Sequence, residues 1–191
     1  MIQQRQVRDN ALIDALEALS ETEINGIVWR VVRGDRDPLR GSAPGGRWDD
    51  GTFEVLYTSL KSDGAVAEVH YHLSRGQSIF PSRMKFRRYE LRVTLTRSLR
   101  LADMTALEAL GMDTARYGAL NYDEKQQEYP RTQEVAEIAH FLNFDGLTVP
   151  SPRWECGNVV IFTDRVPPES LSVENDHGMV DWDEWKRSSG G

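Results

Sequence analysis

The chain has 191 residues and a net charge of −7, with 39% hydrophobic and 28% charged residues, which fits a single globular domain. The single cysteine excludes a disulfide scaffold and fits a reducing compartment, and the composition excludes a collagen-like or mostly disordered chain. No apolar run approaches the ~18 residues of a membrane span and the first residues lack a signal segment, so we expect a cytoplasmic protein that does not bind a membrane.

Helices and strands alternate irregularly along the chain, which predicts the α+β class. The predicted elements are, in chain order, a helix from Asn10 to near Ser20, a strand over 26–32, a long glycine-rich loop over 34–51, a strand over 53–59, a helix from Ser62 or Asp63 to about Leu73, a strand over 86–99, short helical turns over 102–121, a helix from Pro130 to near Asn143, and strands over 146–149 and 158–162. We expect an N-terminal helix within residues 1–24, one domain over 25–171, and an acidic tail over 172–191.

The charge is unevenly distributed. Residues 75–100 hold eight basic side chains and one acidic one, a local net charge of +7. These arginines either form the solvated face of a strand or bind an acidic partner or a phosphate group. The acidic stretch 164–185 either lies against this strand or forms a solvated tail. The overall charge of −7 argues against direct binding of nucleic acid.

Glu68 is the chemically unusual residue, because it lies among alanines and valines of a predicted helix. A carboxylate in such a stretch is rarely buried without a partner or a task. His70 and His72 would diverge on that helix, so we expect no metal site. Cys156 in a turn is expected to be inert, with a Cys–His nucleophile as the less favoured alternative.

Several short motifs follow one another in a distinctive order. They are Trp29-Arg30 at the end of a strand, GGRW over 45–48 in the glycine-rich loop, LYTS over 56–59, Ala65-x-x-Glu68 on the helix, and GLTVPS over 146–151 before GNVVIF over 157–162. This order resembles the RES domain family, which is named for its Arg, Glu and Ser. The resemblance covers roughly residues 25–163. Asp49 stands where the family commonly has Asn after GGRW.

The resemblance implies a fold like that of ADP-ribosyltransferase toxins, with a split β-sheet core and flanking helices. It also implies an enzyme that consumes NAD+ as a substrate, without a bound cofactor or metal. By position, the implied catalytic residues are Arg30, Tyr57 and Glu68. The residues implied to bind NAD+ are Arg30, Arg47, Tyr57 and Ser151. Many members of the family are toxins paired with an Xre-type helix-turn-helix antitoxin that plugs the active site.

The chemistry of these residues agrees with that implication. Arg30 and Arg47 offer planar donors that suit pyrophosphate oxygens. Glu68 could stabilise the positive charge that develops on the ribose when the bond to nicotinamide breaks. Tyr57 offers an aromatic face to nicotinamide. Ser151 could bond the ribose or the carboxamide, or only its own turn.

Three functions stay open at this point. We favour cleavage of NAD+ with water or phosphate as acceptor, since the chain has no room for a separate substrate-recognition domain. A protein ADP-ribosyltransferase is the first alternative. A non-catalytic module that binds a nucleotide or a partner is the second. The sequence leaves the oligomeric state undetermined.

Overall fold

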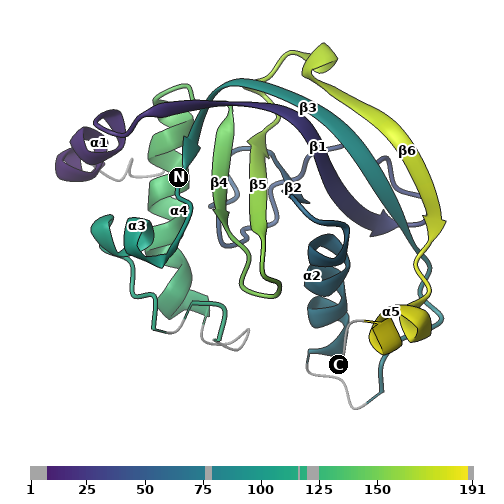
Figure 1. The fold of residues 1–191 in the computed structure, drawn as a ribbon. Helices are drawn as coiled ribbons and strands as arrows, with labels where there is room; N and C mark the ends of the chain where they lie inside the picture. Colours follow the sequence, from purple (N-terminus) through teal and green to yellow (C-terminus); the bar gives the residue numbers. More distant parts are fainter. Residues whose placement is uncertain (1–7, 76–78, 116, 120–124, 189–191) are drawn as a thin grey trace, which may run out of the picture.

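Six strands form the framework of the described part of the chain, and helices flank them (Figure 1). The structure is a computed structural model that describes residues 8–75, 79–115, 117–119 and 125–188, and only the backbone of 125–128. The elements are α1 (Asn10–Glu17), β1 (Glu21–Arg33), β2 (Val55–Ser59), α2 (Ser62–Ser74), β3 (Phe86–Arg100), α3 (Met104–Ala109), α4 (Lys125–Phe141), β4 (Gly146–Pro150), β5 (Gly157–Phe162), η2 (Pro168–Ser170), β6 (Leu171–Met179) and α5 (Trp182–Ser188). The predicted α+β class is confirmed.

The sheet is split into two groups of strands. In one group, β3 pairs with β1 along most of its length and with β6 on its other edge. In the other group, β5 pairs antiparallel with both β2 and β4. The groups meet where Trp29 of β1 pairs with Ser59 of β2, and where β3 runs parallel to β4 over Ser98–Arg100. This arrangement is the split sheet with flanking helices that we predicted.

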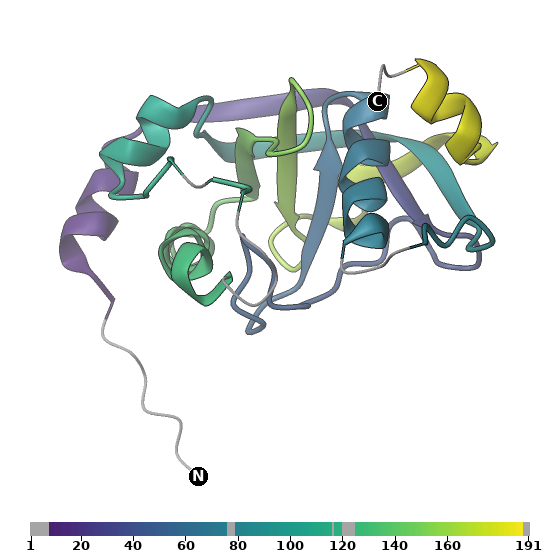
Figure 2. The same cartoon turned by 90° about the horizontal axis from the view of Figure 1, so that it is seen from below.

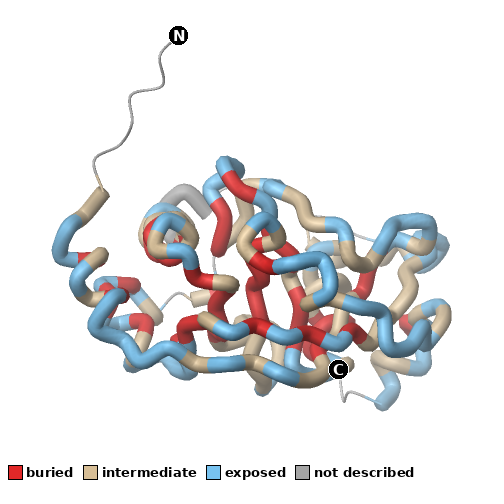
Figure 3. The backbone as a smooth tube through the Cα atoms, turned by 90° about the horizontal axis from the view of Figure 1, so that it is seen from above, coloured by how far each residue is buried: buried red, intermediate tan, exposed pale blue. Residues whose placement is uncertain are grey.

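A first apolar core lies on the inner face shared by the two groups of strands. Along β3, the buried side chains of Leu91, Val93 and Leu95 alternate with exposed ones, as expected for a strand with one covered face. They pack in one cluster with Leu56 of β2 and Ile161 of β5. Figure 3 shows burial concentrated along the strands in the middle of the molecule.

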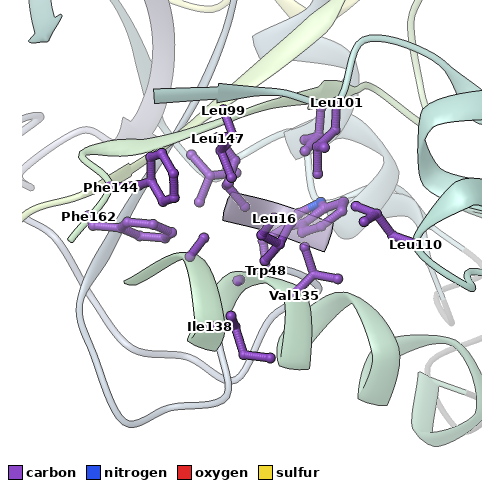
Figure 4. Packing of buried hydrophobic residues seen from close by; sticks show 14 of the residues in the cluster. Leu16, Trp48, Leu99, Leu101, Leu110, Val135, Ile138, Phe144, Leu147 and Phe162 are labelled. Carbon is purple, nitrogen blue, oxygen red and sulfur yellow. The ribbon is translucent and has the colours of Figure 1, made fainter. Parts of the chain in front are cut away.

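A second core joins α1, α4 and the glycine-rich loop to the β4–β5 side of the sheet (Figure 4). Leu16 of α1, Val135 and Ile138 of α4, and Phe162 of β5 are fully buried there. Trp48 of the loop is buried in the same cluster. This packing fixes the end of the loop that carries the GGRW motif.

The expected acidic tail is part of the sheet. Residues Leu171–Met179 form β6, which pairs antiparallel with β3, and Asp176 and Glu174 form ion pairs with Arg87 and Arg92. Of the two alternatives left by the sequence, the acidic segment therefore lies against the basic strand. Opposite charges on neighbouring strands favour their pairing, although at this exposure each ion pair contributes little alone.

Element boundaries differ most from the prediction at the starts of β1 and α4, while α1 ends at Glu17 rather than near Ser20 and β2 begins at Val55 rather than at residue 53. β1 begins at Glu21 rather than at residue 26, because its pairing with β3 extends to Leu99. Helix α4 begins at Lys125, so Pro130 lies inside it rather than in its first turn. No helix within the described residues is both long and apolar enough to cross a membrane.

Candidate functional site

The turn between β4 and β5 lies between helices α2 and α4, as both Figure 1 and Figure 2 show. Three of the predicted site residues come from segments that meet at this turn: Glu68 from α2, Ser151 from the turn itself, and Arg47 from the glycine-rich loop. Segments that are far apart in the sequence are thus brought to one place by the sheet. This region is the candidate site.

Glu68 is half-buried, and one of its carboxylate oxygens is held by two donors. The Ser151 hydroxyl donates to Glu68 Oε1 at 2.9 Å, and the Asn158 amide donates to the same atom at 2.8 Å. No described residue donates a hydrogen bond to Oε2. The carboxylate is therefore held through Oε1, and its second oxygen is free of hydrogen bonds from the described part of the chain.

Close packing of α2 against the sheet sets the position of Glu68. Gly64 lies one helical turn before it, on the same face. A Cβ atom at Gly64 would overlap Ser59 Oγ and Cys156 Sγ. The absence of a side chain at Gly64 thus lets α2 approach β2 and the β4–β5 turn closely enough for Glu68 to reach Ser151 and Asn158.

Replacing Gly64 with alanine is expected to destabilise the protein by about 1–3 kcal/mol, the range for inserting an atom into a close contact. In an open helix the same change stabilises the protein by about 0.5–1 kcal/mol. The sign of the change in unfolding free energy therefore distinguishes a tightly packed Gly64 from an open one. Gly26→Ala is the control, because a Cβ there meets nothing within 4 Å. The measurement is unfolding by denaturant, and a stabilised Gly64→Ala protein would contradict the close-packing argument.

Ser151 both caps its own turn and holds Glu68. Its hydroxyl accepts a hydrogen bond from Arg153 N at 3.2 Å while donating to Glu68. The two roles considered from the sequence were a turn cap and a ligand contact. The structure shows the turn cap, together with a contact to Glu68 that the sequence did not indicate.

Arg47 lies between two tyrosine rings. Its guanidinium carbon is 4.4 Å from the ring centroid of Tyr117 and 5.5 Å from that of Tyr129, distances at which a cation is attracted by the ring face. The Tyr117 hydroxyl donates to the carbonyl of Pro150 at 2.8 Å, which ties this ring to the turn that carries Ser151. Burial raises the pKa of Tyr117 to about 12, against an opposing effect of the Arg47 charge.

Asp49 organises the glycine-rich loop. It is fully buried, and its carboxylate accepts hydrogen bonds from the backbone of Gly45 and Gly46 and from the Tyr57 hydroxyl, at 2.7 to 2.9 Å. Gln133 of α4 donates to the carbonyl oxygens of Gly46 and Asp49. Both oxygens of the Asp49 carboxylate are therefore used within the loop.

Tyr57 of β2 forms hydrogen bonds with this loop. Its hydroxyl donates to Asp49 and accepts from the backbone of Trp48 at 3.0 Å. Burial raises its pKa well above the ordinary value, and the adjacent Asp49 charge adds to the effect. A Cβ on Gly46 would come within 2.7 Å of this hydroxyl. These contacts make Tyr57 a support for the loop, whereas its predicted contact with nicotinamide stays a prediction.

Replacing Asp49 with asparagine is expected to lower the free energy of unfolding by about 1–3 kcal/mol. An amide offers one acceptor oxygen, and its nitrogen would face the donor of Gly45 or Gly46. Asp50→Asn is the matched control, since Asp50 is exposed and bonds only within its own turn to Thr52. Equal unfolding midpoints for the two variants would contradict the role of Asp49.

Positive charge gathers beside Glu68. Loss of hydration lowers the pKa of His72; the Glu68 carboxylate opposes this, and the charges of Arg75, Arg153 and Arg47 lower it further. The Arg153 guanidinium carbon lies 3.3 Å from the ring centroid of Tyr71. His72 is thus within electrostatic range of the Glu68 carboxylate and of three arginines, and a group of positive charges favours an anionic ligand.

Arg30 has a different position. Its guanidinium donates from one nitrogen to the carbonyl oxygens of Pro38 and Arg40, at 2.6 and 3.1 Å. Burial lowers its pKa to about 10, with a smaller effect from the nearby Arg36 charge. The structure brings Arg47, Glu68 and Ser151 together, whereas it engages Arg30 in holding the first part of the glycine-rich loop.

His70, His72 and Cys156, the other candidates considered from the sequence, all contact neighbouring side chains. His70 packs among Phe80, Trp182 and Trp185, and His72 lies near Glu68, so the pair diverges on α2 as expected. The sulfur of Cys156 lies 3.3 Å from Ser59 Oγ, under the start of α2. Within the described residues, no three His, Cys, Asp or Glu side chains converge as a metal site would require.

A surface hollow of about 510 Å³ lies away from these residues. It is lined by Leu39, Arg40, Gly41, Thr52, Phe53, Glu54, Thr163 and Asp164. None of the converging residues described above lines it. The candidate site therefore rests on the arrangement of its side chains and not on the size of a cavity.

The pattern that defines the RES domain matches residues 27–183. The chain belongs to the RES domain family. The match passes residue 171, where the sequence placed the end of the domain, and includes β6 and the start of α5. A comparison with curated proteins finds no match for this RES domain.

The fold of this RES domain is shared with a solved structure. A chain of the crystal structure of the M. tuberculosis MbcT–MbcA toxin–antitoxin complex superposes with a TM-score of 0.78, over 96% of this chain and 99% of that chain. The two sequences are 20% identical. The comparison confirms the α+β fold with a central sheet and flanking helices.

Two residues of the site were not predicted from the sequence. Asn158 contacts Glu68 and Tyr117 contacts Arg47, but neither was expected to have a role. A usable signal existed for Asn158, since it is a polar residue at the start of the apolar run GNVVIF. Tyr117 lies in an irregular segment, where neither spacing nor composition predicts a partner.

Proposed function

We propose that this RES domain consumes NAD+ by cleaving its nicotinamide–ribose bond, and that it is the toxin of a toxin–antitoxin pair. Family membership supports an NAD+-using enzyme, because members resembling this sequence use NAD+ as hydrolases, phosphorylases or ADP-ribosyltransferases. The solved relative of the same fold comes from a toxin–antitoxin complex.

The observation that carries the proposal is the state of Glu68. Its carboxylate is fixed through Oε1, while Oε2 accepts no hydrogen bond from a described residue. Bond cleavage builds positive charge on the ribose, as in glycoside hydrolysis. A carboxylate oxygen that is already oriented stabilises that charge without reorganisation during the reaction. We assign this role to Glu68 Oε2.

The arginines beside Glu68 suit the other end of the substrate. NAD+ carries a pyrophosphate, whose oxygens are bound best by planar guanidinium groups. The charges of Arg47 and Arg153 both act on His72, as does the Glu68 carboxylate. Arg47 also lies against Tyr117, whose hydroxyl donates to the carbonyl of Pro150 beside Ser151. We therefore assign pyrophosphate binding to Arg47 and Arg153; the contact of Arg30 with the pyrophosphate, expected from the sequence, stays a prediction.

In the proposed reaction, the bond between ribose C1′ and the nicotinamide nitrogen breaks, and its electron pair leaves with nicotinamide. An acceptor oxygen then forms a new bond to C1′. With water, the products are nicotinamide, ADP-ribose and one proton. With phosphate, they are nicotinamide and ADP-ribose 1″-phosphate. Tyr57 contributes by holding Asp49 and Trp48, and with them the loop of Arg47.

The experiment that tests this proposal is incubation of the purified protein with NAD+, with and without phosphate, followed by mass analysis of the products. Release of nicotinamide supports cleavage, and the second product identifies the acceptor. Mass added to the protein or to a supplied protein supports the alternative, a protein ADP-ribosyltransferase. If NAD+ stays intact but binds, the chain is a non-catalytic module.

The proposed partner is a small antitoxin of the Xre helix-turn-helix type. The basic face of β3 is in part neutralised by β6, so the positive charge near Glu68 is the better target for an acidic segment of the partner. Such a segment would compete with NAD+, because both would use Arg47 and Arg153. Inhibition that is not competitive with NAD+ would contradict this mode of binding.

A further inference from the structure

The side-chain amide of Asn158 contacts Glu68 through its nitrogen, whereas its oxygen is buried without a hydrogen bond from any described residue. Its side-chain nitrogen donates to Glu68 Oε1 at 2.8 Å. Its side-chain oxygen is buried and has no hydrogen-bond partner among the described residues. A buried acceptor without a partner reduces stability. An asparagine at position 158 therefore lowers the stability of the fold, so its presence needs an explanation other than stability.

The carboxylate of Glu68 dictates how this amide is oriented. An ionised carboxylate can only accept hydrogen bonds, so the amide must present its nitrogen. The amide oxygen then points away from Glu68, where no described residue donates to it. The unsatisfied oxygen is thus the consequence of supplying a donor to Glu68.

The backbone of Asn158 is held rigidly. It lies at the start of β5, where it pairs with Ser59 of β2 on one side and with Val149 of β4 on the other. Ser151, the second donor to Glu68, belongs to the turn that joins β4 and β5. Two donors from one rigid hairpin therefore meet a single oxygen of a residue on α2.

We propose that Asn158 is a positioning residue that orients the Glu68 carboxylate so that Oε2 faces the ribose of the substrate. The proposal rests on the role of Glu68 proposed above. Ser151 alone would leave the carboxylate free to rotate about its donor, whereas two donors on Oε1 fix its plane. Supporting groups of this kind on rigid elements keep a site in its productive geometry.

The test is the Asn158→Ala variant in the full chain. We expect kcat for NAD+ cleavage to fall roughly 10- to 100-fold and KM to stay within about twofold, since the orientation matters mainly in the transition state. We expect Tm to stay the same or rise, because the unsatisfied oxygen is removed. A merely structural residue would instead lower Tm with little effect on kcat.

Asn175→Ala is the matched control. The Asn175 amide also donates to a glutamate, Glu90, at 3.2 Å, but on the β3–β6 face. This control should leave kcat unchanged. Equal kcat values for Asn158→Ala and wild type would overturn the proposal. Asn158→Asp retains the shape and removes the donor, so it should lose at least as much kcat and serves if the alanine variant does not fold.

A crystal structure of Asn158→Ala makes the test independent of activity. We expect the Glu68 carboxylate to rotate or to occupy more than one orientation. An unchanged single orientation would overturn the proposal, even if the wild-type protein proved inactive. Intact NAD+ with wild-type protein would instead count against the proposed function, so the two failures are distinguishable.

Discussion

Replacing Glu68 with glutamine is expected to reduce NAD+ turnover on the order of 10²-fold or more while leaving the fold intact. Glutamine retains an oxygen that can accept from Ser151 and Asn158, so the local hydrogen bonds survive. The negative charge that would stabilise the ribose cation is lost. Binding of NAD+ should be retained or tightened, because the change removes a negative charge from the region where Arg47, Arg75 and Arg153 act on His72.

The measurement is nicotinamide release at saturating NAD+, together with the Kd for NAD+ and the unfolding midpoint. Glu174→Gln is the control, since Glu174 pairs with Arg92 on the exposed β3–β6 face. This control should retain full turnover. A folded Glu68→Gln protein with wild-type turnover would remove Glu68 from the reaction.

Replacing Arg47 with lysine is expected to raise the KM and Kd for NAD+ about 10- to 100-fold. Hydrogen bonds to charged groups are each worth roughly 1.5–3 kcal/mol, and lysine cannot form the planar pair of donors that phosphate oxygens accept. Lysine also lacks the flat guanidinium that lies against Tyr117 and Tyr129. Retaining the positive charge therefore does not restore the site.

The control for Arg47 is Arg92→Lys, which changes a guanidinium of the same type in the surface pair with Glu174. Its effect on NAD+ binding should be negligible. If Arg47→Lys binds NAD+ as well as wild type does, Arg47 only anchors the loop against Tyr117. Calorimetric titration with NAD+ measures both variants directly, without depending on catalysis.

The sequence identified the chemistry-bearing residues more reliably than their partners. GGRW, LYTS and Ala65-x-x-Glu68 are local patterns, and the structure brings Glu68 into contact with Ser151. The role predicted for Arg30 with NAD+ stays a prediction; what the sequence did not indicate is that Arg30 bonds the loop that follows its strand. The carbonyl oxygens that engage Arg30 lie in that loop.

The position of the acidic C-terminal segment is a second feature that the sequence could not predict. Composition revealed a basic stretch and an acidic one, but charge alone could not decide whether they touch. The pairing of β6 with β3 decided it, because backbone hydrogen bonds between the strands set a register in which Asp176 lies opposite Tyr89, within reach of the Arg87 side chain.

The fold class, the RES family resemblance and the candidate carboxylate follow from the sequence alone, since periodicity and short motifs are local properties of the chain. The partners of Glu68 became known only from the folded structure. Close packing at Gly64 and the β4–β5 turn bring Ser151 and Asn158, 83 and 90 residues away in sequence, to one oxygen. Contacts over such separations arise from sheet pairing and side-chain packing, which no local pattern encodes.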